Sequence, residues 1–368
     1  MNWGGGIIMK IVPVQGLILN EPEHLDVVIQ AHTGEEIAMI MQVSIPNDSF
    51  KKKVFLDTVY FVKYSELRKF SPIEYEKIIA QFPNTKTFAL IECRYNKWAE
   101  IYYLKISLSI IYIAKRWKNE IDSDFFDQSR TMNAYFTRDG LKSTIWDVTL
   151  GSRELDSNDF DLTIPCYYTI DDLPDTYRLP VHRYHTLKID SSIQTEIEKM
   201  STVLIKNSRI SSKLKSALNL LYTTFSFSNL DLIIPTYGTI LETLLLENNE
   251  ENQRKKVAVR AACLIQDKQS IGKKRYISNW IYYFYKYRNM IVHDGKSHLH
   301  IRVEEEVIFN NAVNLIQHVI YSLIKIYADS NIENINQVKD IVNKNKSADG
   351  FSSAFEYIDE KLCMYYEE

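Results

Sequence analysis

The C-terminal part of the chain carries a long apolar stripe with the spacing of an α-helix. Between residues 302 and 329 the stripe consists of Val303, Val307, Ala312, Leu315, Val319, Leu323 and Tyr327. A helix with one apolar side is stable only when other helices cover that side. Helical spacing also appears in the segments 214–225, 232–247, 253–266 and 277–293, which short polar loops join. The sequence therefore predicts an all-α bundle for this part of the chain.

The first half of the chain has the alternating pattern of β-strands. Apolar and polar residues alternate from 102 to 110, and similar short runs occur at 25–30, 37–43, 54–62, 87–93 and 143–150. A period of two places apolar residues on one face of a strand. One helix is predicted at 72–82, where Ser71 can cap it and Pro72 suits the first helical position. We expect a β-rich first half and an α+β chain overall.

The two halves meet in a segment that fits neither pattern. Residues 171–190 read DDLPDTYRLPVHRYHTLKID, with two prolines and clustered polar residues. Such segments separate domains more often than they form part of a core. We therefore place a β-rich α+β domain at 1–185 and an all-α domain at 186–368.

Composition argues against several classes of protein. The four cysteines lie far apart and form no CxxC pair, which argues against a structural zinc site and a disulfide scaffold. His182 and His185 have a spacing that zinc sites use, but the segment 171–190 contains no Cys, so we expect no metal. The start MNWGGGIIMKI does not resemble a signal peptide, and the apolar run 101–114 is too short to span a bilayer. We expect a cytoplasmic protein that does not enter the membrane.

Charge is unevenly distributed along the chain. The net charge is −3, yet the segment from Lys206 to Arg302 contains sixteen Lys and Arg against seven Asp and Glu. A basic segment in an acidic protein favours an anionic partner, with nucleic acid first among the candidates. The alternative is a solvated helix face, which charge clusters alone favour about equally.

The predicted helix at 277–293 has an arginine where its apolar stripe should continue. Arg288 falls on the line formed by Ile277, Ile281, Phe284 and Ile291. An arginine facing a core is costly unless it is paired or lines a cleft. Arg288 therefore either forms an internal ion pair, for which Glu242 is the candidate, or faces a ligand.

Asn289 and His293 lie one turn apart on the neighbouring face of this helix. Arg288 and His293 are about 140° apart around the helix axis. Only the length of the arginine side chain, or a second copy of the chain, can bring the two groups together. Gly295 follows where a helix is expected to end. An imidazole at this position can donate or accept a proton near neutral pH.

Three segments of this region resemble the Apea-like branch of the HEPN superfamily. TYGTILETLLLE (236–247), KKVAVRAACLIQD (255–267) and WIYYFYKYRNMIVHDGKS (280–297) follow the order of that branch: a leucine-glutamate helix, an "RAA-L" helix and a "YR-N/S--VHG" motif. The motif holds Arg288, Asn289 and His293 in the R-x(4–6)-H spacing. One departure is Asp294, which stands before Gly295 where the branch often has Gly directly. The resemblance covers roughly residues 232–325, and the first half is similar in architecture to domains that precede HEPN domains in prokaryotic anti-phage proteins.

The resemblance implies an endoribonuclease that needs no metal or cofactor and works as a homodimer. Under this hypothesis His293 acts as acid or base, Arg288 holds the phosphate, and Asn289 orients either group. A two-fold dimer would place two copies of each in one cleft. The expected partner is RNA, with tRNA among the candidates.

Further side chains beside the motif are expected to contact RNA by charge or by base stacking: Lys286, Tyr287 and Lys296. The basic runs 254–256 and 273–275 are candidate contacts to the RNA backbone, or equally solvated charges. We interpret Glu242 and Arg260 as residues that pair inside the bundle.

Three hypotheses for function follow from these features. The first is an endoribonuclease that acts as an abortive-infection effector and whose first half senses a phage-derived trigger. The second is a non-catalytic HEPN module that dimerises and binds RNA or a nucleotide. The third is the regulatory half of a toxin–antitoxin pair. Because a fold can carry unrelated functions, the choice depends on the site around Arg288 and His293.

Overall fold

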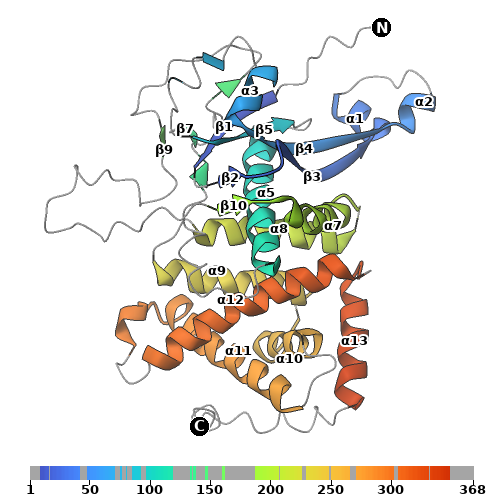
Figure 1. Ribbon diagram of the computed structural model, residues 1–368. Helices are drawn as coiled ribbons and strands as arrows, with labels where there is room; N and C mark the ends of the chain where they lie inside the picture. The colour runs from blue at the N-terminus through green and yellow to red at the C-terminus, as the bar shows by residue number, and fades with distance from the viewer. Residues whose placement is uncertain are drawn as a thin grey trace, which may run out of the picture. The chain divides into compact units, whose positions relative to one another are not determined.

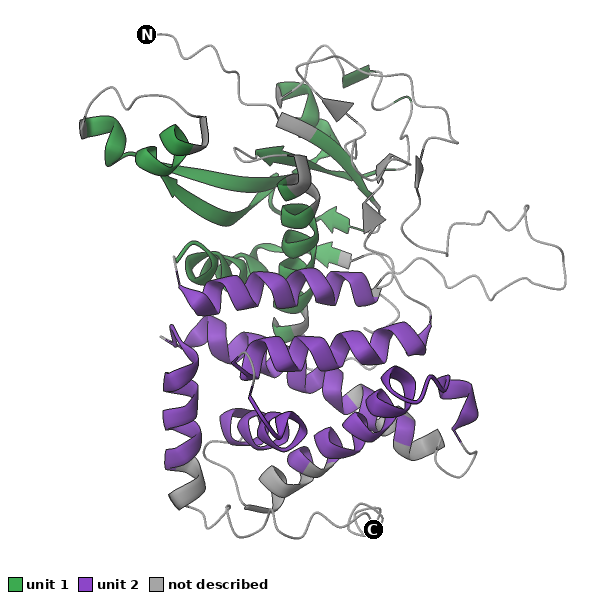
Figure 2. Cartoon of the chain, turned by 180° about the vertical axis from the view of Figure 1, so that it is seen from behind, with its two compact units in different colours: residues 1–206 green, residues 207–368 purple. Residues whose placement is uncertain are grey.

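The computed structural model describes most of the predicted elements of both halves. The described residues are 9–15, 17–41, 48–70, 75, 76, 80, 85–92, 97–118, four two-residue strands between 133 and 161, 187–206, 208–225, 229–247, 250–265, 271–301, 306–330 and 332–348. Contacts divide the chain into two compact units, residues 1–206 and 207–368, which Figure 2 draws in different colours. The first unit holds an antiparallel sheet and the second is helical, so the α+β fold class is confirmed.

The division between the units falls after Lys206, further along the chain than the boundary placed at 185 from the sequence. Two elements that follow residue 185 belong to the first unit because they contact its strands. Strand β10 (Leu187–Ile189) pairs in parallel with β2 (Leu17–Leu19), and helix α7 (Gln194–Leu204) contacts β3 (His24–Thr33). These pairings join residues far apart in sequence, which a change of local composition does not reveal.

The first unit is built on an antiparallel sheet with the strand order β3-β4-β5-β1-β6, and β8 also pairs with β1. The remaining strands of this sheet are β1 (Met9–Gln15), β4 (Val54–Lys63), β5 (Thr87–Glu92), β6 (Asn133–Ala134) and β8 (Trp146–Asp147). Strands β7 (Phe136–Thr137) and β9 (Phe160–Asp161) form a separate pair. The strands predicted at 25–30, 54–62 and 87–93 are confirmed. The alternating pattern did not mark β1, which contains Pro13 at a paired position.

The strand predicted at 102–110 is wrong, because this segment lies within helix α5 (Lys97–Lys118). Residues on every side of the helix are buried, including Ser107 and Ser109, so apolar residues need not follow a helical stripe. Ser107 satisfies its hydroxyl by donating to the carbonyl of Tyr103 at 2.8 Å. The helix contacts β3, β4, β5 and α7 (Figure 1), and this burial on several sides made the period ambiguous.

The strand predicted at 37–43 is also wrong, because residues 34–41 form helix α1 (Gly34–Met41). A capping box starts this helix: the Thr33 N–H donates to Glu36 Oε2 at 2.7 Å, and the Glu36 N–H donates to Thr33 Oγ1 at 3.2 Å. Two short helices follow, α2 (Asp48–Lys51) and α3 (Tyr64–Phe70). Of the helix predicted at 72–82, Tyr75, Glu76 and Ala80 are helical and the rest lies outside the described residues. Of the strand predicted at 143–150, only β8 is described.

The second unit consists of helices, as the apolar spacing predicted. They are α8 (Arg209–Phe225), α9 (Leu230–Leu245), α10 (Gln253–Ile265), α11 (Ile271–Val292), α12 (Glu306–Asp329) and α13 (Ile335–Ala348). Helix α9 contacts α8, α10, α11 and α12, and α10 contacts α9, α11, α12 and α13 (Figure 1). Tyr327 of α12 is fully buried and donates to the Leu244 carbonyl of α9 at 2.7 Å. Among the described residues of the whole chain, no helix is both long and apolar enough to cross a bilayer.

Candidate functional site

Helix α11 positions the candidate motif at its C-terminal end. Ile277, Ile281 and Phe284 are buried and hold one side of the helix against the bundle. The helix stops at Val292, and Gly295 follows with a φ of 64°, a conformation that glycine adopts without strain. The N–H groups of Asp294 and Lys296 return to the carbonyls of Asn289 and Met290. This wide last turn accommodates Asp294, the residue that departs from the HEPN pattern.

The side chains of Arg288 and His293 meet within a single chain. Arg288 Nη1 lies 3.3 Å from His293 Nε2 and 3.3 Å from Asn289 Oδ1. The arginine side chain is 19% exposed, whereas His293 is exposed at the end of the helix. A guanidinium can only donate, so a hydrogen bond between these two atoms requires Nε2 to be the acceptor. The structure therefore gathers all three motif residues into one small cluster at the surface.

Glu242 of α9 holds the guanidinium of Arg288 from the opposite side. Its carboxylate lies 3.6 Å from Arg288 Nη2 and accepts a hydrogen bond from the Tyr285 hydroxyl at 3.2 Å. Burial and the neighbouring Glu242 carboxylate raise the pKa of the Tyr285 hydroxyl, so it stays a donor. The two interpretations of Arg288 are thus compatible, because Nη2 faces the ion pair while Nη1 faces His293. The sequence suggested Glu242 as a partner but did not reveal Tyr285.

Gly238 of α9 leaves room for the arginine side chain. A Cβ atom at position 238 would lie 3.3 Å from Arg288 Cγ and 3.4 Å from Arg288 Nε. Nε itself is buried, and no acceptor for it is found among the described residues. The arginine is therefore positioned by close packing against α9 and by the Glu242 carboxylate. A larger residue at 238 would push the guanidinium away from its place.

Asp231, near the start of α9, anchors the loop that follows the motif. It accepts hydrogen bonds from Ser297 Oγ at 2.6 Å, from the His298 N–H at 2.6 Å and from His298 Nδ1 at 2.8 Å. Burial acts to raise the pKa of Asp231, but these hydrogen bonds outweigh it and lower the pKa. The His298 ring also stacks on Phe309 of α12. These contacts hold residues 297 and 298 in place, and no local sequence signal marked Asp231.

The three residues expected to contact RNA beside the motif differ in their exposure to solvent. Lys286 and Lys296 are exposed. Tyr287 is only 2% exposed and packs edge-on against Phe309, with ring centroids 5.1 Å apart. A buried ring is not available for stacking on a base, so Tyr287 belongs to the core and is removed from the candidate contacts. Its place one residue before Arg288 puts it on the side of the helix that faces α12.

The basic run 254–256 is partly engaged inside the second unit. The Arg254 guanidinium lies over the Tyr282 ring at 3.2 Å and donates to the Tyr282 carbonyl at 3.0 Å. Lys256 pairs with Glu250 at 3.2 Å, and Lys255 is exposed. The side chains of the second run, 273–275, lie outside the described residues. Arg254 and Lys256 of this run therefore stabilise the bundle, whether or not the run also binds a ligand.

Arg260 pairs with Glu250. The sequence predicted that Arg260 would pair inside the bundle but did not name this partner. Its guanidinium donates to both carboxylate oxygens, at 2.9 and 2.8 Å, and to the Leu245 carbonyl at 2.7 Å. The Arg260 guanidinium, together with the Glu247 N–H and Lys256, lowers the pKa of Glu250 to about 2, although burial acts the other way. Because this pKa lies below the ordinary value of a glutamate, ionised Glu250 stabilises the fold at neutral pH.

We expect Glu250→Gln to lower the free energy of unfolding by about 2 kcal/mol at pH 7, because it leaves the buried Arg260 guanidinium without a counter-charge. The stabilisation is complete above about pH 4.5 and declines as the pH falls towards 2. The difference between wild type and variant should therefore shrink in acid. Calorimetric unfolding at pH 7, 5 and 4 measures it, with exposed Glu251→Gln as the matched control. A difference that stays constant with pH would contradict the assignment.

Metal-ligating side chains do not cluster in the part of the chain that the structure describes, where no group of three or more His, Cys, Asp or Glu is found. His182 and His185 lie outside the described residues. The absence of a metal site thus stays a prediction.

Comparison of the chain with models of protein families, with curated proteins and with solved structures gives no match. The resemblance to HEPN domains therefore rests on the sequence segments alone. The cluster at the end of α11 consists of Arg288, Asn289, His293, Glu242 and Tyr285.

Proposed function

We propose that the second unit is a HEPN-type endoribonuclease that cleaves RNA without a metal ion. The observation that carries the proposal is the 3.3 Å approach of Arg288 Nη1 to His293 Nε2 at the exposed end of α11. A fixed cation beside a group that can accept or donate a proton is what phosphodiester cleavage by an internal hydroxyl requires. Glu242, Tyr285 and the packing against Gly238 support the proposal because they hold the guanidinium in one place.

The proposed reaction uses the 2′-hydroxyl of the RNA as its nucleophile. A His293 imidazole takes the 2′ proton while the 2′ oxygen forms a bond to phosphorus. Arg288 stabilises the additional negative charge of the phosphorane through its N–H donors. The bond from phosphorus to the 5′ oxygen then breaks, and a protonated imidazole gives that oxygen its proton. The products are a 2′,3′-cyclic phosphate and a free 5′-hydroxyl, with no net gain or loss of protons.

The reaction needs both a base and an acid, but the motif contains one imidazole per chain. A homodimer would supply two imidazoles, one for each role. Exposed apolar side chains near the motif support this assembly: Val292 is 44% exposed, Leu299 is 80% exposed and Leu232 is 48% exposed. Leu232 follows Asp231, which binds the loop that carries Leu299. Apolar groups in such a position favour a protein partner. A second copy of the chain related by a two-fold axis would place both motifs in one cleft.

The proposed partners are RNA, with tRNA among the candidates, and a second copy of this chain. Lys286 and Lys296 are candidate contacts to the RNA backbone because they are exposed beside the motif. The biological setting that we propose is abortive-infection defence in the cytoplasm, with the first unit as the sensor of a phage-derived trigger. A toxin–antitoxin pair remains the alternative setting.

The ion pair between Arg288 and Glu242 favours a second candidate function, a non-catalytic module that dimerises and binds RNA or a nucleotide. A guanidinium held mainly by a carboxylate organises the bundle without touching a substrate. The two candidates differ in whether RNA is shortened, which makes them separable by one assay.

The assay incubates the protein with total RNA and purified tRNA in excess EDTA and maps the ends of the fragments. We expect cleavage that EDTA does not inhibit and fragments that end in a 2′,3′-cyclic phosphate. Tight binding of RNA that never shortens it would support the non-catalytic module. Cleavage that requires added Mg²⁺ or leaves 5′-phosphates would contradict the proposed chemistry.

The packing of Arg288 against α9 predicts that Gly238→Val lowers the cleavage rate about tenfold. The added side chain displaces the guanidinium from His293, and a displacement of this kind weakens positioning more than folding. The rate is measured with saturating RNA, and calorimetry checks the unfolding temperature. Thr239→Val on the exposed side of the same helix is the matched control and should cleave like wild type.

A further inference from the structure

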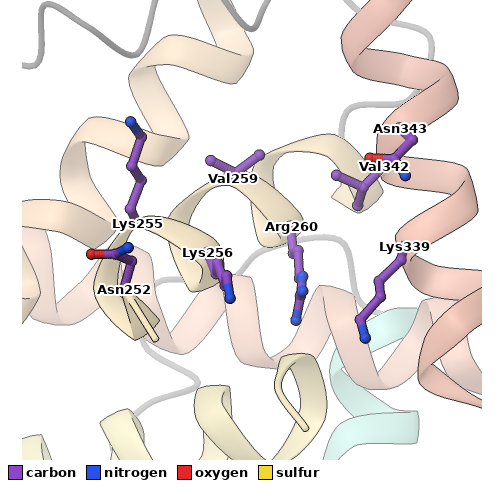
Figure 3. Close-up of a pocket in the computed structure, with 8 residues that line it drawn as sticks. All are labelled: Asn252, Lys255, Lys256, Val259, Arg260, Lys339, Val342 and Asn343. Atoms are coloured by element: carbon purple, nitrogen blue, oxygen red, sulfur yellow. The ribbon is translucent and has the colours of Figure 1, made fainter. Parts of the chain in front are cut away.

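Three basic side chains beside α10 and α13 are already paired within the fold. Lys256, Arg260 and Lys339 line a cavity of about 350 Å³ and extend in the same direction (Figure 3). The Glu250 carboxylate pairs with all three, at distances of 3.2, 2.8 and 3.9 Å in that order. A polar group whose hydrogen bonds are complete gains little from a ligand. A binding site is better indicated by an accessible polar atom that lacks a partner.

The imidazole of His298 offers such an atom. Its Nδ1 lies 2.8 Å from Asp231 Oδ1, and because an ionised carboxylate can only accept, Nδ1 is the donor. Its Nε2 has no hydrogen-bond partner among the described residues. The side chain is 24% exposed, and Nε2 is not among the buried polar atoms that lack a partner. Nε2 therefore reaches the solvent with its hydrogen-bonding capacity unused.

The direction in which Nε2 points is fixed by the surroundings of the ring. The ring stacks on Phe309 of α12 with an interplanar angle of 12°, while Asp231 holds the other nitrogen. Anchoring of the loop does not by itself require an imidazole, because Ser297 Oγ and the His298 N–H already donate to the two oxygens of Asp231. A ring that is held in this way loses little conformational entropy when it binds a ligand.

The free nitrogen lies near the motif of the proposed nuclease. Asp231 and Gly238 are seven residues apart on α9, and Gly238 packs against Arg288. The rise per residue of a helix places these two positions about 10 Å apart along α9. Lys296, the exposed candidate contact to the RNA backbone, belongs to the same loop as His298. An RNA strand with its scissile phosphate at Arg288 can therefore reach His298 with a neighbouring nucleotide.

We propose that His298 is a specificity-determining residue of the proposed nuclease and that its Nε2 accepts a hydrogen bond from a nucleotide beside the scissile phosphate. A neutral imidazole that donates from Nδ1 can only accept at Nε2. The donors that RNA offers are N–H groups of the bases, such as the amino group of cytosine, and the ribose 2′-hydroxyl. Uracil has a carbonyl oxygen where cytosine has its amino group, so an acceptor distinguishes the two bases. The inference rests on the proposed function, because it takes Arg288 as the phosphate site.

Binding of single-stranded oligonucleotides tests the proposal in the full chain carrying His293→Ala, so that RNA is bound but not cut. The probes are oligocytidine, oligouridine and oligodeoxycytidine, each of about ten nucleotides. If the base amino group is the donor, both cytosine probes should bind roughly fivefold more tightly than oligouridine. If the 2′-hydroxyl is the donor, both ribose probes should bind roughly fivefold more tightly than oligodeoxycytidine. Either result supports the proposal and identifies the group that His298 contacts.

Adding His298→Ala to this chain should remove the difference between the probes. Asp231 keeps its hydrogen bonds to Ser297 Oγ and to the backbone N–H of residue 298, so the loop is expected to stay anchored. Adding His300→Ala instead is the matched control, because His300 is an exposed histidine of the same segment. It should leave the ratios of the affinities unchanged.

The outcomes separate this proposal from the nuclease. It is overturned if no probe binds, if all three bind equally, or if the ratios survive His298→Ala. It is also overturned if that substitution weakens all three probes by the same factor, which is the result expected of a purely structural residue. Ratios that depend on His298 in a protein that never cleaves RNA would support the contact and contradict the nuclease. Cleavage by the wild type without such ratios would do the reverse.

Discussion

Replacing His293 by Ala should lower the rate of RNA cleavage by about 10³-fold in the EDTA assay. The imidazole is the proposed base and acid. Without it, no group removes the 2′ proton and no group protonates the leaving 5′ oxygen. The side chain is exposed, and among the described residues its hydrogen-bonding contact is with Arg288, so the fold should be unaffected. Calorimetry is expected to show an unchanged unfolding temperature.

His300→Ala is the matched control for this prediction. His300 is also an exposed histidine close to the end of α11, and its ring contacts only the Ser297 carbonyl among the recorded hydrogen bonds. It should cleave at nearly the wild-type rate. If His293→Ala retained more than about a tenth of the activity, the imidazole would not be the group that transfers the protons. If both histidine variants lost activity equally, the loss would come from a disturbed conformation of the segment 293–300 and not from the missing imidazole of the motif.

Introducing a charge with Leu299→Asp should convert the proposed dimer to a monomer and lower the proposed cleavage about 100-fold. Leu299 is 80% exposed in a loop that Asp231 fixes, so it contributes apolar surface beside the motif without contributing to the core. A carboxylate buried in a two-fold interface would be duplicated by symmetry, and the two charges would repel each other. With only one motif per molecule, no second imidazole would be present to act as the acid.

Sedimentation velocity and the cleavage assay, carried out at the same protein concentration, measure this effect. Met39→Asp is the control, because Met39 is 70% exposed on α1 in the other unit and receives the same charge. It should leave both assembly and cleavage unchanged. An active Leu299→Asp monomer would show that one chain is sufficient for cleavage and would remove the homodimer from the proposal.

Local sequence pattern was sufficient for much of the helical unit. The helices predicted at 232–247 and 253–266 match α9 and α10 to within a few residues, and the predicted stop at Gly295 agrees with its positive φ. Helix spacing and turn residues are local properties, because they depend on neighbours three or four positions away. The same reasoning found three of the sheet strands and failed at α5 and α1. Burial on several sides hides the period in α5, and in α1 the β-rich composition of residues 37–43 hid the helix that the capping box at Thr33 starts.

The candidate site likewise has features that the sequence predicted and features that only the fold decided. The motif Arg288, Asn289 and His293 was visible in the sequence, but the angle of about 140° between its two key residues left open whether one chain could join them. The fold decided this by packing Arg288 against Gly238 and Glu242 of another helix, which directs Nη1 towards His293. It also buried Tyr287 and brought Asp231 to the loop after the motif.

The sequence was thus enough to predict an α+β chain, a helical second half and the residues of the motif, because periodicity and residue type are properties of short segments. The direction of the Arg288 side chain and the accessibility of its neighbours were decided only by the tertiary structure. These features depend on contacts between helices that are far apart in the chain, and no local pattern records which side chains will meet there.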